Sequence, residues 1–331
     1  MEDNAGMNAP RRTPPTSPPT SPQASPQASL KTTKQATAQP TAQGGDKYDV
    51  RPEQSVELLK ALHILTREGK LNQDSRRKLK QVYHLFNFIE PLLQKVQAQH
   101  ADVTVVDHGA GKSYLGFILY DLFFKLQAPQ GRVVGVEVRD DLVQRSAQLA
   151  REFGFKGMDF LNLSVAASES AQQLPKRIDI VTALHACNTA TDDAIAFGLK
   201  HQVQHMVLVP CCQAEVAATL KEAKAKIAPN NPLAELWRHP LHTREFGSQL
   251  TNVLRCLQLE AHGYSVTVTE LVGWEHSMKN ELIIATRYAD ARGASTAATR
   301  AVRLHDVLSQ LGLDAMRPRF FTPLVDQKST N

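Results

Sequence analysis

The alternation of short apolar runs with amphipathic stretches, which begins at Asp102, is the feature that most constrains how this chain can fold. Five apolar runs follow one another between residues 103 and 212: VTVVDHG, RVVGVEV, MDFLNLSV, IDIVTALHA and HMVLVPCC. Four stretches with helical spacing of their apolar residues lie between and after these runs. Nearly continuous apolar strands that alternate with helices are typical of a parallel sheet covered on both faces. We therefore predict an α/β, Rossmann-like fold.

The pattern changes after Pro232. A long helix is expected from Arg244 to Gly263, and the runs YSVTVTELV and NELIIATR follow it. Because no helix separates these two runs, they are predicted to pair as an antiparallel hairpin beside the parallel sheet. Five parallel strands that end in such a hairpin resemble the outline of a class I methyltransferase.

Composition and pattern divide the 331 residues into four parts. Residues 1–46 are rich in Pro, Ser, Thr, Gln and Ala and contain almost no large apolar side chains, so we expect a disordered tail. Residues 47–100 show helical spacing and are predicted to form a helical cap. Residues 101–287 hold the alternating pattern of the predicted methyltransferase domain, and residues 288–331 form a basic extension with one further helix.

The net charge of +5 resides in the flanks, because the central part of the chain carries more acidic than basic side chains. Basic flanks could contact a polyanion such as RNA, or they could be solvated helix faces. The cations Arg76, Arg77, Lys78 and Lys80 stand just before a helix that is expected to pack near the site. There they could contact phosphates, so RNA is the predicted partner.

The sequence shows no sign of a membrane or secretory destination. No stretch approaches the roughly 18 apolar residues that a membrane span requires, and the N-terminal tail lacks the apolar core of a secretory signal. None of the four cysteines forms a Cys-x-x-Cys pair, which argues against a disulfide framework and a zinc ribbon. We expect a soluble, cytoplasmic protein without a membrane partner.

The stretch VVDHGAGKSYLG contains two closely spaced glycines at the end of the first apolar run. A Walker A loop would need a glycine where Val106 stands, and a dinucleotide fingerprint would need a third glycine where Tyr114 stands. What remains is Asp-x-Gly-x-Gly, formed by Asp107, Gly109 and Gly111. The glycines permit a tight turn and close backbone approach, and the acid suits the ammonium group of S-adenosylmethionine better than it suits a phosphate.

Two further positions fit the same cofactor. The second run ends in GVEV, which places Glu137 where a carboxylate can accept both hydroxyls of an adenosine ribose. The third run ends near Ser164, with Asn162 close by, and either side chain could reach the adenine amine. The alternative is a tight strand-to-helix turn with an incidental glutamate.

Three motifs together resemble one family of class I methyltransferases. They are Asp-x-Gly-x-Gly-Lys-Ser-Tyr-Leu, Leu-His-Ala-Cys-x-x-Ala-Thr-Asp and Pro-Cys-Cys. The combination is similar to bacterial methyltransferase-domain proteins and, more distantly, to the eukaryotic tRNA 2′-O-methyltransferases that act on the acceptor stem. It also resembles the methyltransferase-like part of a glutathione S-transferase C-terminal-domain protein. The resemblance spans roughly residues 75 to 287.

The resemblance implies roles for residues at the ends of the strands. It implies that S-adenosylmethionine is the cofactor and that Asp107, Gly109, Gly111 and Glu137 hold it. It further implies that the methyl-transfer site is lined by His185, Cys187, Asp192, Cys211 and Cys212. One departure is Asn188, because relatives tend to have glycine after the His-x-Cys unit.

The protein must align a nucleophile with the activated methyl group and remove one proton. His185 and Asp192 are candidate general bases, with His276 and Lys279 as possible partners. Each has a structural alternative. Asp192 could cap the helix that begins beside it, and His185 could be a hydrogen-bonded residue under the cofactor.

The cysteines suggest two further kinds of chemistry. Cys187 and Cys211 stand where RNA cytosine-carbon methyltransferases carry thiolates, although the Pro-Cys-Ser pattern of those enzymes is missing. His185 with the three nearby cysteines could bind zinc, but the adjacent Cys211 and Cys212 would point to opposite faces of a strand, so no metal is expected. Small side chains packed at the end of the sheet are the alternative.

The sequence thus predicts an S-adenosylmethionine-dependent methyltransferase that acts on tRNA or rRNA, at a ribose hydroxyl or a base nitrogen. Three alternatives stay open: a protein or small-molecule methyltransferase, an RNA cytosine-carbon methyltransferase that uses Cys187 and Cys211, and a non-catalytic protein that binds S-adenosylmethionine. The sequence leaves the role of Lys112 open.

Overall fold

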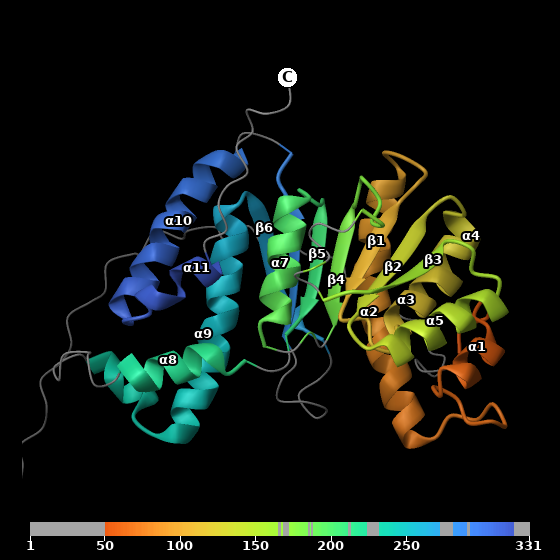
Figure 1. Ribbon diagram of the computed structural model, residues 1–331, viewed down its shortest axis with the longest axis horizontal. Helices are drawn as coiled ribbons and strands as arrows, with labels where there is room; N and C mark the ends of the chain where they lie inside the picture. Colours follow the sequence, from red (N-terminus) through yellow and green to blue (C-terminus); the bar gives the residue numbers. More distant parts are fainter. Residues whose placement is uncertain are drawn as a thin grey trace, which may run out of the picture. The chain divides into compact units, whose positions relative to one another are not determined.

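The computed structural model describes residues 50–164, 172–184, 188–210, 213–223, 232–271, 281–289 and 292–320, together with residues 167 and 186 (Figure 1). The predicted tail of residues 1–46 lies outside these ranges. Within the described ranges, no helix has the length and apolar character needed to cross a membrane.

A seven-stranded sheet forms the centre of the fold. Its strands are β1 (Thr104–His108), β2 (Arg132–Glu137), β3 (Met158–Asn162), β4 (Ile180–Leu184), β5 (His205–Val209), β6 (Tyr264–Glu270) and β7 (Glu281–Arg287). They lie in the order β3-β2-β1-β4-β5-β7-β6. The first five are parallel, and β7 is antiparallel to both β5 and β6. The predicted parallel sheet with an antiparallel hairpin is therefore confirmed.

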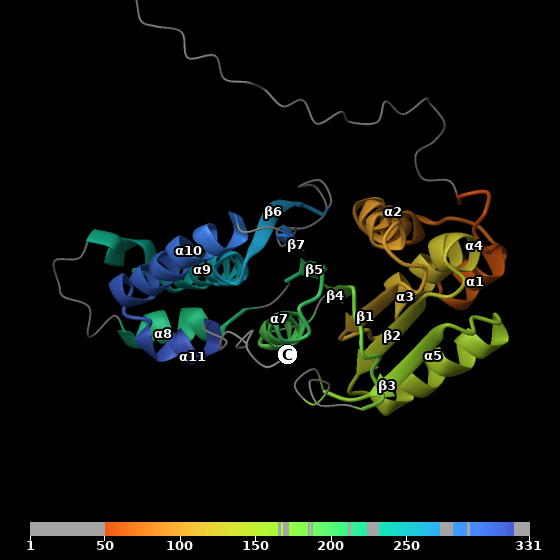
Figure 2. The ribbon, with the colours of Figure 1, turned by 90° about the horizontal axis from the view of Figure 1, so that it is seen from above.

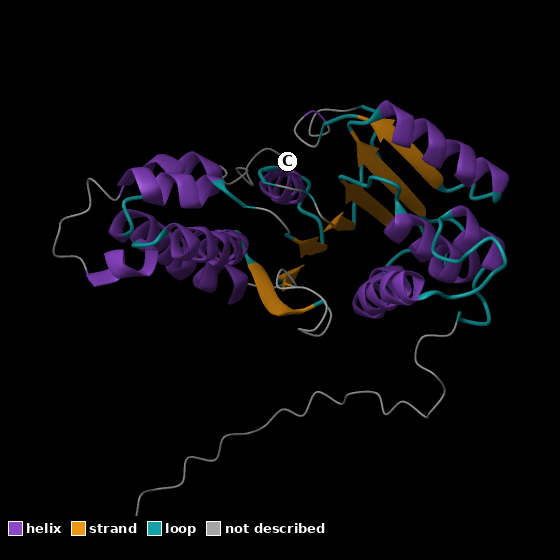
Figure 3. Cartoon of the chain, turned by 90° about the horizontal axis from the view of Figure 1, so that it is seen from below, coloured by secondary structure: helices purple, strands orange, loops and turns teal. Residues whose placement is uncertain are grey.

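Helices cover both faces of this sheet (Figures 2 and 3). The larger ones are α1 (Val56–Ala61), α2 (Gln73–Gln97), α3 (Tyr114–Leu119), α5 (Asp140–Glu152), α7 (Ala190–Lys200), α8 (Glu215–Ala223), α9 (Pro240–Ala261) and α10 (Arg292–Gln310). A π-helical turn at Tyr120–Phe124 joins α3 to the short α4 (Lys125–Gln127), and α11 (Arg317–Phe320) ends the described chain.

The alternation of side chains along the strands divides the core between the two faces. Val105 of β1 belongs to a cluster with Leu85 of α2 and Phe117 of α3. Its neighbour Val106 points to the other face and belongs to a cluster with Phe197 of α7. Successive strand residues face opposite sides of a sheet, so a run that is apolar at every position predicts burial on both faces. The helices at residues 56–97 therefore pack on the same core as the sheet.

Local signals explain where the helices begin. Asn72 caps α2, because its side-chain oxygen accepts from the backbone N–H of Ser75 at 2.8 Å. The helix expected to start at Arg244 starts earlier, at Pro240. Proline is well suited to the first helical position, where no intrahelical N–H bond is needed, so Pro240 rather than the first apolar repeat marks the start of α9.

The C-terminal helices build a third cluster with α8 and α9. Leu304 and Leu308 of α10 and Phe320 of α11 pack with Leu220 of α8 and Leu254 of α9. Ion pairs add to this packing, since Arg300 Nε lies 3.1 Å from Glu260 Oε2. The basic C-terminal segment is therefore packed onto α8 and α9 as far as residue 320.

Candidate functional site

The glycine loop that follows β1 adopts a backbone that explains its composition. Gly109 has a φ of 65° and Gly111 a φ of 56°, both in the left-handed region. Glycine enters this region without steric cost. Ser113 has a φ of 52° although it is not glycine, so the loop also holds a strained residue at the start of α3. The two left-handed glycines form a sharp turn of the backbone at the end of the sheet.

Asp107 is buried beneath this loop, with 3% of its surface exposed. Its Oδ1 accepts a hydrogen bond from the Thr182 hydroxyl at 2.6 Å, and the two residues are partners in the β1–β4 register. Burial raises the pKa of Asp107 to about 7, the hydrogen bond from Thr182 opposes this, and the charge of Glu137 adds to it. Asp107 therefore joins two neighbouring strands directly under the glycine loop.

Glu137, the last residue of β2, faces the same loop. Its Oε2 accepts from the backbone N–H of Gly111 at 2.9 Å, and its Oε1 accepts from the backbone N–H of Arg139 at 3.0 Å. These two bonds fix the carboxylate at the carboxyl end of the sheet beside the glycines. The structure thus brings together Asp107, Gly109, Gly111 and Glu137.

Ser164 lies two residues beyond the end of β3. Its hydroxyl accepts from the backbone N–H of Ala167 at 3.0 Å, which is a local turn contact. The Asn162 side chain donates from Nδ2 to Asp140 Oδ1 at 3.1 Å. Both side chains are exposed, so they remain accessible near the first turn of α5.

The loop after β4 contains a left-handed residue that is not glycine. Asn188 has a φ of 51°, and asparagine tolerates the left-handed region better than most residues do. Its carbonyl oxygen accepts from Arg255 Nη2 at 3.0 Å. The departure from the family pattern therefore preserves the backbone conformation that a glycine would supply.

Asp192 forms a buried ion pair with Arg255 of α9. Arg255 Nε lies 2.7 Å from Asp192 Oδ1, and Arg255 Nη2 lies 2.8 Å from Asp192 Oδ2. Arg255 is 1% exposed and Asp192 is 6% exposed. Arg255 Nη1 also donates to Asn252 Oδ1 at 3.2 Å. Both carboxylate oxygens are engaged by one guanidinium, a bidentate geometry that fixes the side chains.

This ion pair bears on the roles expected for Asp192. Helix α7 has no side-chain cap at its N-terminal residue Thr189, and the Asp192 oxygens bind Arg255. The structure thus shows a third arrangement besides the general base and the helix cap. The ion pair ties the first turn of α7 to the middle of α9.

Several predicted site residues lie outside the described residues: His185, Cys187, Cys211, Cys212, His276 and Lys279. Ala186, between two of them, is described, and it lies 3.7 Å from the position that a Cβ on Gly109 would take. Ala186 therefore borders the glycine loop. Among the described residues, no three His, Cys, Asp or Glu side chains converge as metal ligands.

The predicted RNA-binding cations lie in the first turns of α2. Arg76 and Arg77 are exposed, while Lys78 and Lys80 are half-buried and make further interactions. His84, in the first half of the same helix, approaches the carbonyl oxygen of Glu270 at 3.3 Å. Because Glu270 ends β6, which runs parallel to β5, this part of α2 lies at the carboxyl edge of the sheet.

Sequence reasoning missed Arg255 and Thr182. A signal for Arg255 was present, because a single arginine interrupts the apolar face of the stretch LTNVLRCLQLEA. A charge on a buried helix face needs a partner of opposite charge. Thr182 carried no comparable signal, since threonine is common in strands.

Comparisons with known proteins agree with this architecture. Residues 77–219 match a family model described as "Methyltransferase domain". The glutathione S-transferase C-terminal domain-containing protein of Bos taurus is 25% identical over 245 residues, which cover 67% of this chain and 35% of the relative. The human protein of that name is 25% identical over 238 residues, again 67% and 35% of the two chains. The chain thus spans about a third of the length of these curated relatives.

Among solved structures, the magnesium protoporphyrin IX methyltransferase of Synechocystis with bound SAH is 16% identical, with a TM-score of 0.40 over 70% of this chain and 94% of the other. Fibrillarin of Aeropyrum pernix, bound to S-adenosyl-L-methionine, is 11% identical, with a TM-score of 0.34 over 56% of this chain and 67% of the other. Residues 77–219 are similar to a methyltransferase domain, and the sheet that holds them has the strand order of an α/β, Rossmann-like fold.

Proposed function

We propose that this domain transfers a methyl group from S-adenosylmethionine to RNA, at a ribose hydroxyl or a base nitrogen of tRNA or rRNA. The observation that supports an RNA substrate is the position of Arg76 and Arg77. Both are exposed in the first turns of α2, the helix whose His84 lies beside Glu270 at the carboxyl edge of the sheet. Ligands of open α/β sheets bind at this edge, so a polyanion held by these cations would lie beside the methyl donor.

The residues around the glycine loop fit S-adenosylmethionine. The left-handed Gly109 and Gly111 let the backbone approach a ligand closely. The Glu137 carboxylate, held beside Gly111, is the group we expect to accept from the ribose hydroxyls. Asp107 places a carboxyl group beneath the loop, which is negatively charged above its pKa of about 7 and then favours the ammonium group, and Ser164 is the proposed neighbour of the adenine. When bound, the cofactor supplies an electrophilic methyl group.

The proton of the acceptor needs a base, and we assign this role to His185. The adjacent residue Ala186 borders the glycine loop. Asp192 is the proposed positioning residue of this loop, because its ion pair with Arg255 and the bond from Arg255 to the Asn188 carbonyl tie residues 188 and 192 to α9. Cys211 is the alternative nucleophile that a carbon methylation would require.

A labelling experiment tests the substrate class. The full-length protein is incubated with methyl-labelled S-adenosylmethionine and, separately, with total RNA, total protein and a small-molecule extract from cells that lack the gene. Label in RNA that is lost on ribonuclease treatment supports the proposal, and label only in protein or small molecules refutes it. Nucleoside analysis then separates ribose methylation, nitrogen methylation and cytosine-carbon methylation.

Two variants separate cofactor binding from catalysis. Asp107→Ala is expected to abolish binding of S-adenosylmethionine in calorimetry, because it removes the carboxylate beneath the loop. His185→Ala is expected to retain that binding and lose transfer, by roughly 10²- to 10⁴-fold for a general base. If Asp107→Ala binds the cofactor as the wild type does, the assignment of the glycine loop as the cofactor site is wrong.

A further inference from the structure

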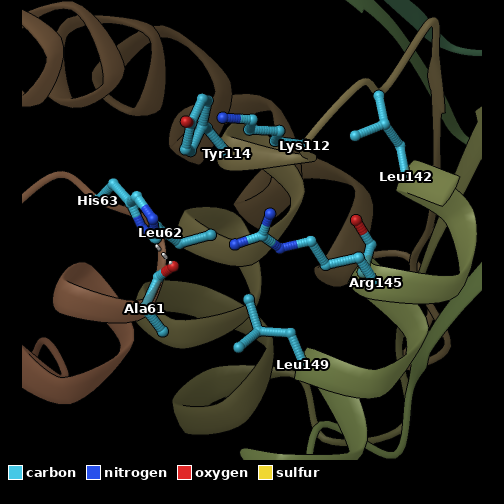
Figure 4. Close-up of a pocket in the computed structure, with 9 residues that line it drawn as sticks. Ala61, Leu62, His63, Lys112, Tyr114, Leu142, Arg145 and Leu149 are labelled. Atoms are coloured by element: carbon cyan, nitrogen blue, oxygen red, sulfur yellow. Dashed lines mark hydrogen bonds between the residues drawn. The ribbon is translucent and has the colours of Figure 1, made fainter.

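A pocket beside the glycine loop collects positively charged side chains and no carboxylate. Its lining residues come from the end of α1 and the turn after it, from the loop before α3 and its first residue, and from one side of α5: Ala61, Leu62, His63, Lys112, Tyr114, Leu142, Arg145, Ser146 and Leu149. Figure 4 shows the side chains of Lys112 and Arg145 extending in the same direction, towards the segment that carries Leu62 and His63. Two cations from different elements thus share one pocket.

Neither cation is neutralised within the described part of the chain. Within the described residues, no hydrogen bond or ion pair is made by the side chain of Lys112 or of Arg145. Asp141, four residues before Arg145 on α5, is at the spacing of a helical ion pair. It binds Arg139 instead, with Nη2 and Oδ2 3.0 Å apart. Lys112 and Arg145 therefore keep their hydrogen-bond donors for a ligand.

The proposed contacts of the expected cofactor lie outside this pocket. S-adenosylmethionine carries no phosphate, its one anionic group is the methionine carboxylate, and its proposed contacts, Asp107, the two loop glycines and Glu137, do not line the pocket. Lys112 follows Gly111 directly, in a Gly-Lys-Ser sequence whose upstream half cannot build a Walker cradle. A lysine and an arginine that line one pocket without an acid favour an anion there, and arginine is the side chain best shaped for phosphate oxygens.

We propose that this pocket binds a backbone phosphate of the RNA acceptor, with Lys112 and Arg145 as the phosphate ligands. Tyr114 supplies an aromatic face in the same pocket, and aromatic faces stack on unpaired bases. The proposal rests on the proposed function, because it requires an RNA substrate. It adds a second contact region, on the side of α5, to the cations Arg76 and Arg77 of α2.

The test measures RNA affinity and its salt dependence in the full-length protein. The probe is a fluorescently labelled tRNA transcript, and anisotropy is recorded over a series of salt concentrations. Lys112→Ala and Arg145→Ala are each expected to weaken binding roughly tenfold at low salt. Each lost phosphate contact should also reduce the slope of log K against log salt by about 0.7 to 0.9. Arg151→Ala is the matched control, since Arg151 is exposed on the same helix and does not line this pocket.

Calorimetry with S-adenosylmethionine distinguishes the pocket from the cofactor site. The two pocket variants are expected to bind the cofactor with wild-type affinity and to raise KM for RNA without lowering kcat. Wild-type RNA affinity and salt slope in both variants would overturn the proposal and leave the proposed function intact. Loss of cofactor binding in Lys112→Ala would assign the pocket to the cofactor instead. If the wild type binds no RNA at all, the proposed function itself fails.

Discussion

Variants of the buried ion pair between Asp192 and Arg255 can distinguish a structural role of Asp192 from a catalytic one. Asp192→Asn keeps the shape of the side chain and removes its charge, which leaves the Arg255 guanidinium buried without a counter-charge. Breaking a buried pair in this way costs about 3–5 kcal/mol. Arg255 retains two neutral acceptors, the Asn188 carbonyl at 3.0 Å and Asn252 Oδ1 at 3.2 Å. We therefore expect the free energy of unfolding to fall by an amount near the lower end of this range, about 3 kcal/mol.

Urea unfolding measures this loss. For an m value of about 3 kcal/mol per molar, at the upper end of the usual range, a loss of about 3 kcal/mol lowers the midpoint by about 1 M. Arg255→Met should lower it by a similar amount, because it leaves the Asp192 carboxylate buried. The double variant Asp192→Leu with Arg255→Met removes both charges and should recover most of the loss, since apolar replacements of buried pairs are often neutral or stabilising.

Methyl transfer by the same variants tests the positioning role. If Asp192 only holds the loop, the double variant should bind S-adenosylmethionine and retain measurable turnover at temperatures where it is folded. If Asp192 is instead the general base, a different result is expected. Turnover would fall by about 10²-fold or more in Asp192→Asn with an unchanged urea midpoint, and the double variant would stay inactive. That outcome would refute the positioning role.

Three further predictions concern single positions. Because the folded protein holds the Asp107 proton up to about pH 7 whereas the unfolded chain releases it near 3.8, this residue lowers stability increasingly as pH rises between those values, by up to about 4 kcal/mol. Urea midpoints compared with Asp107→Asn over this range should show that slope only in the wild type. Asn188→Gly should leave the unfolding midpoint almost unchanged, whereas Asn188→Val should destabilise by about 1–2 kcal/mol because of the positive φ; equal midpoints would contradict this reasoning. Gly247→Ala, which gains about 1 kcal/mol in an ordinary helix, should instead lower the melting temperature, because its Cβ would lie 2.7 Å from backbone and side-chain atoms of Ala217.

The fold was predictable because a strand that is buried on both faces of a sheet has apolar residues at consecutive positions. A run such as VTVVDHG is apolar at consecutive positions, and β1 is buried at each of its five residues. The hairpin followed from the absence of a helix between two runs. The start of α9 was harder to place, since Pro240 precedes the first clear apolar repeat.

The site residues were predictable where the sequence of one segment alone determines its backbone conformation. Gly109 and Gly111 indicate left-handed backbone wherever they occur in such a turn. The pairing of Asp192 with Arg255 joins residues that are 63 positions apart, and no local pattern specifies which charge a buried arginine meets. The bond from Gly111 to Glu137 likewise depends on how two strands stagger, which is decided by packing and not by either segment alone.

The third cluster, in which the C-terminal helices pack on α8 and α9, affects where the chain can be cut. The family match ends at residue 219, inside α8 and before β6 and β7, so it does not coincide with a cooperative folding unit. A fragment trimmed to those bounds would lose the strand beside β5 and would uncover Val216 on the part of α8 that remains. An open strand edge next to an uncovered apolar face promotes self-association. Recombinant fragments should therefore extend through Phe320 to behave as monodisperse protein.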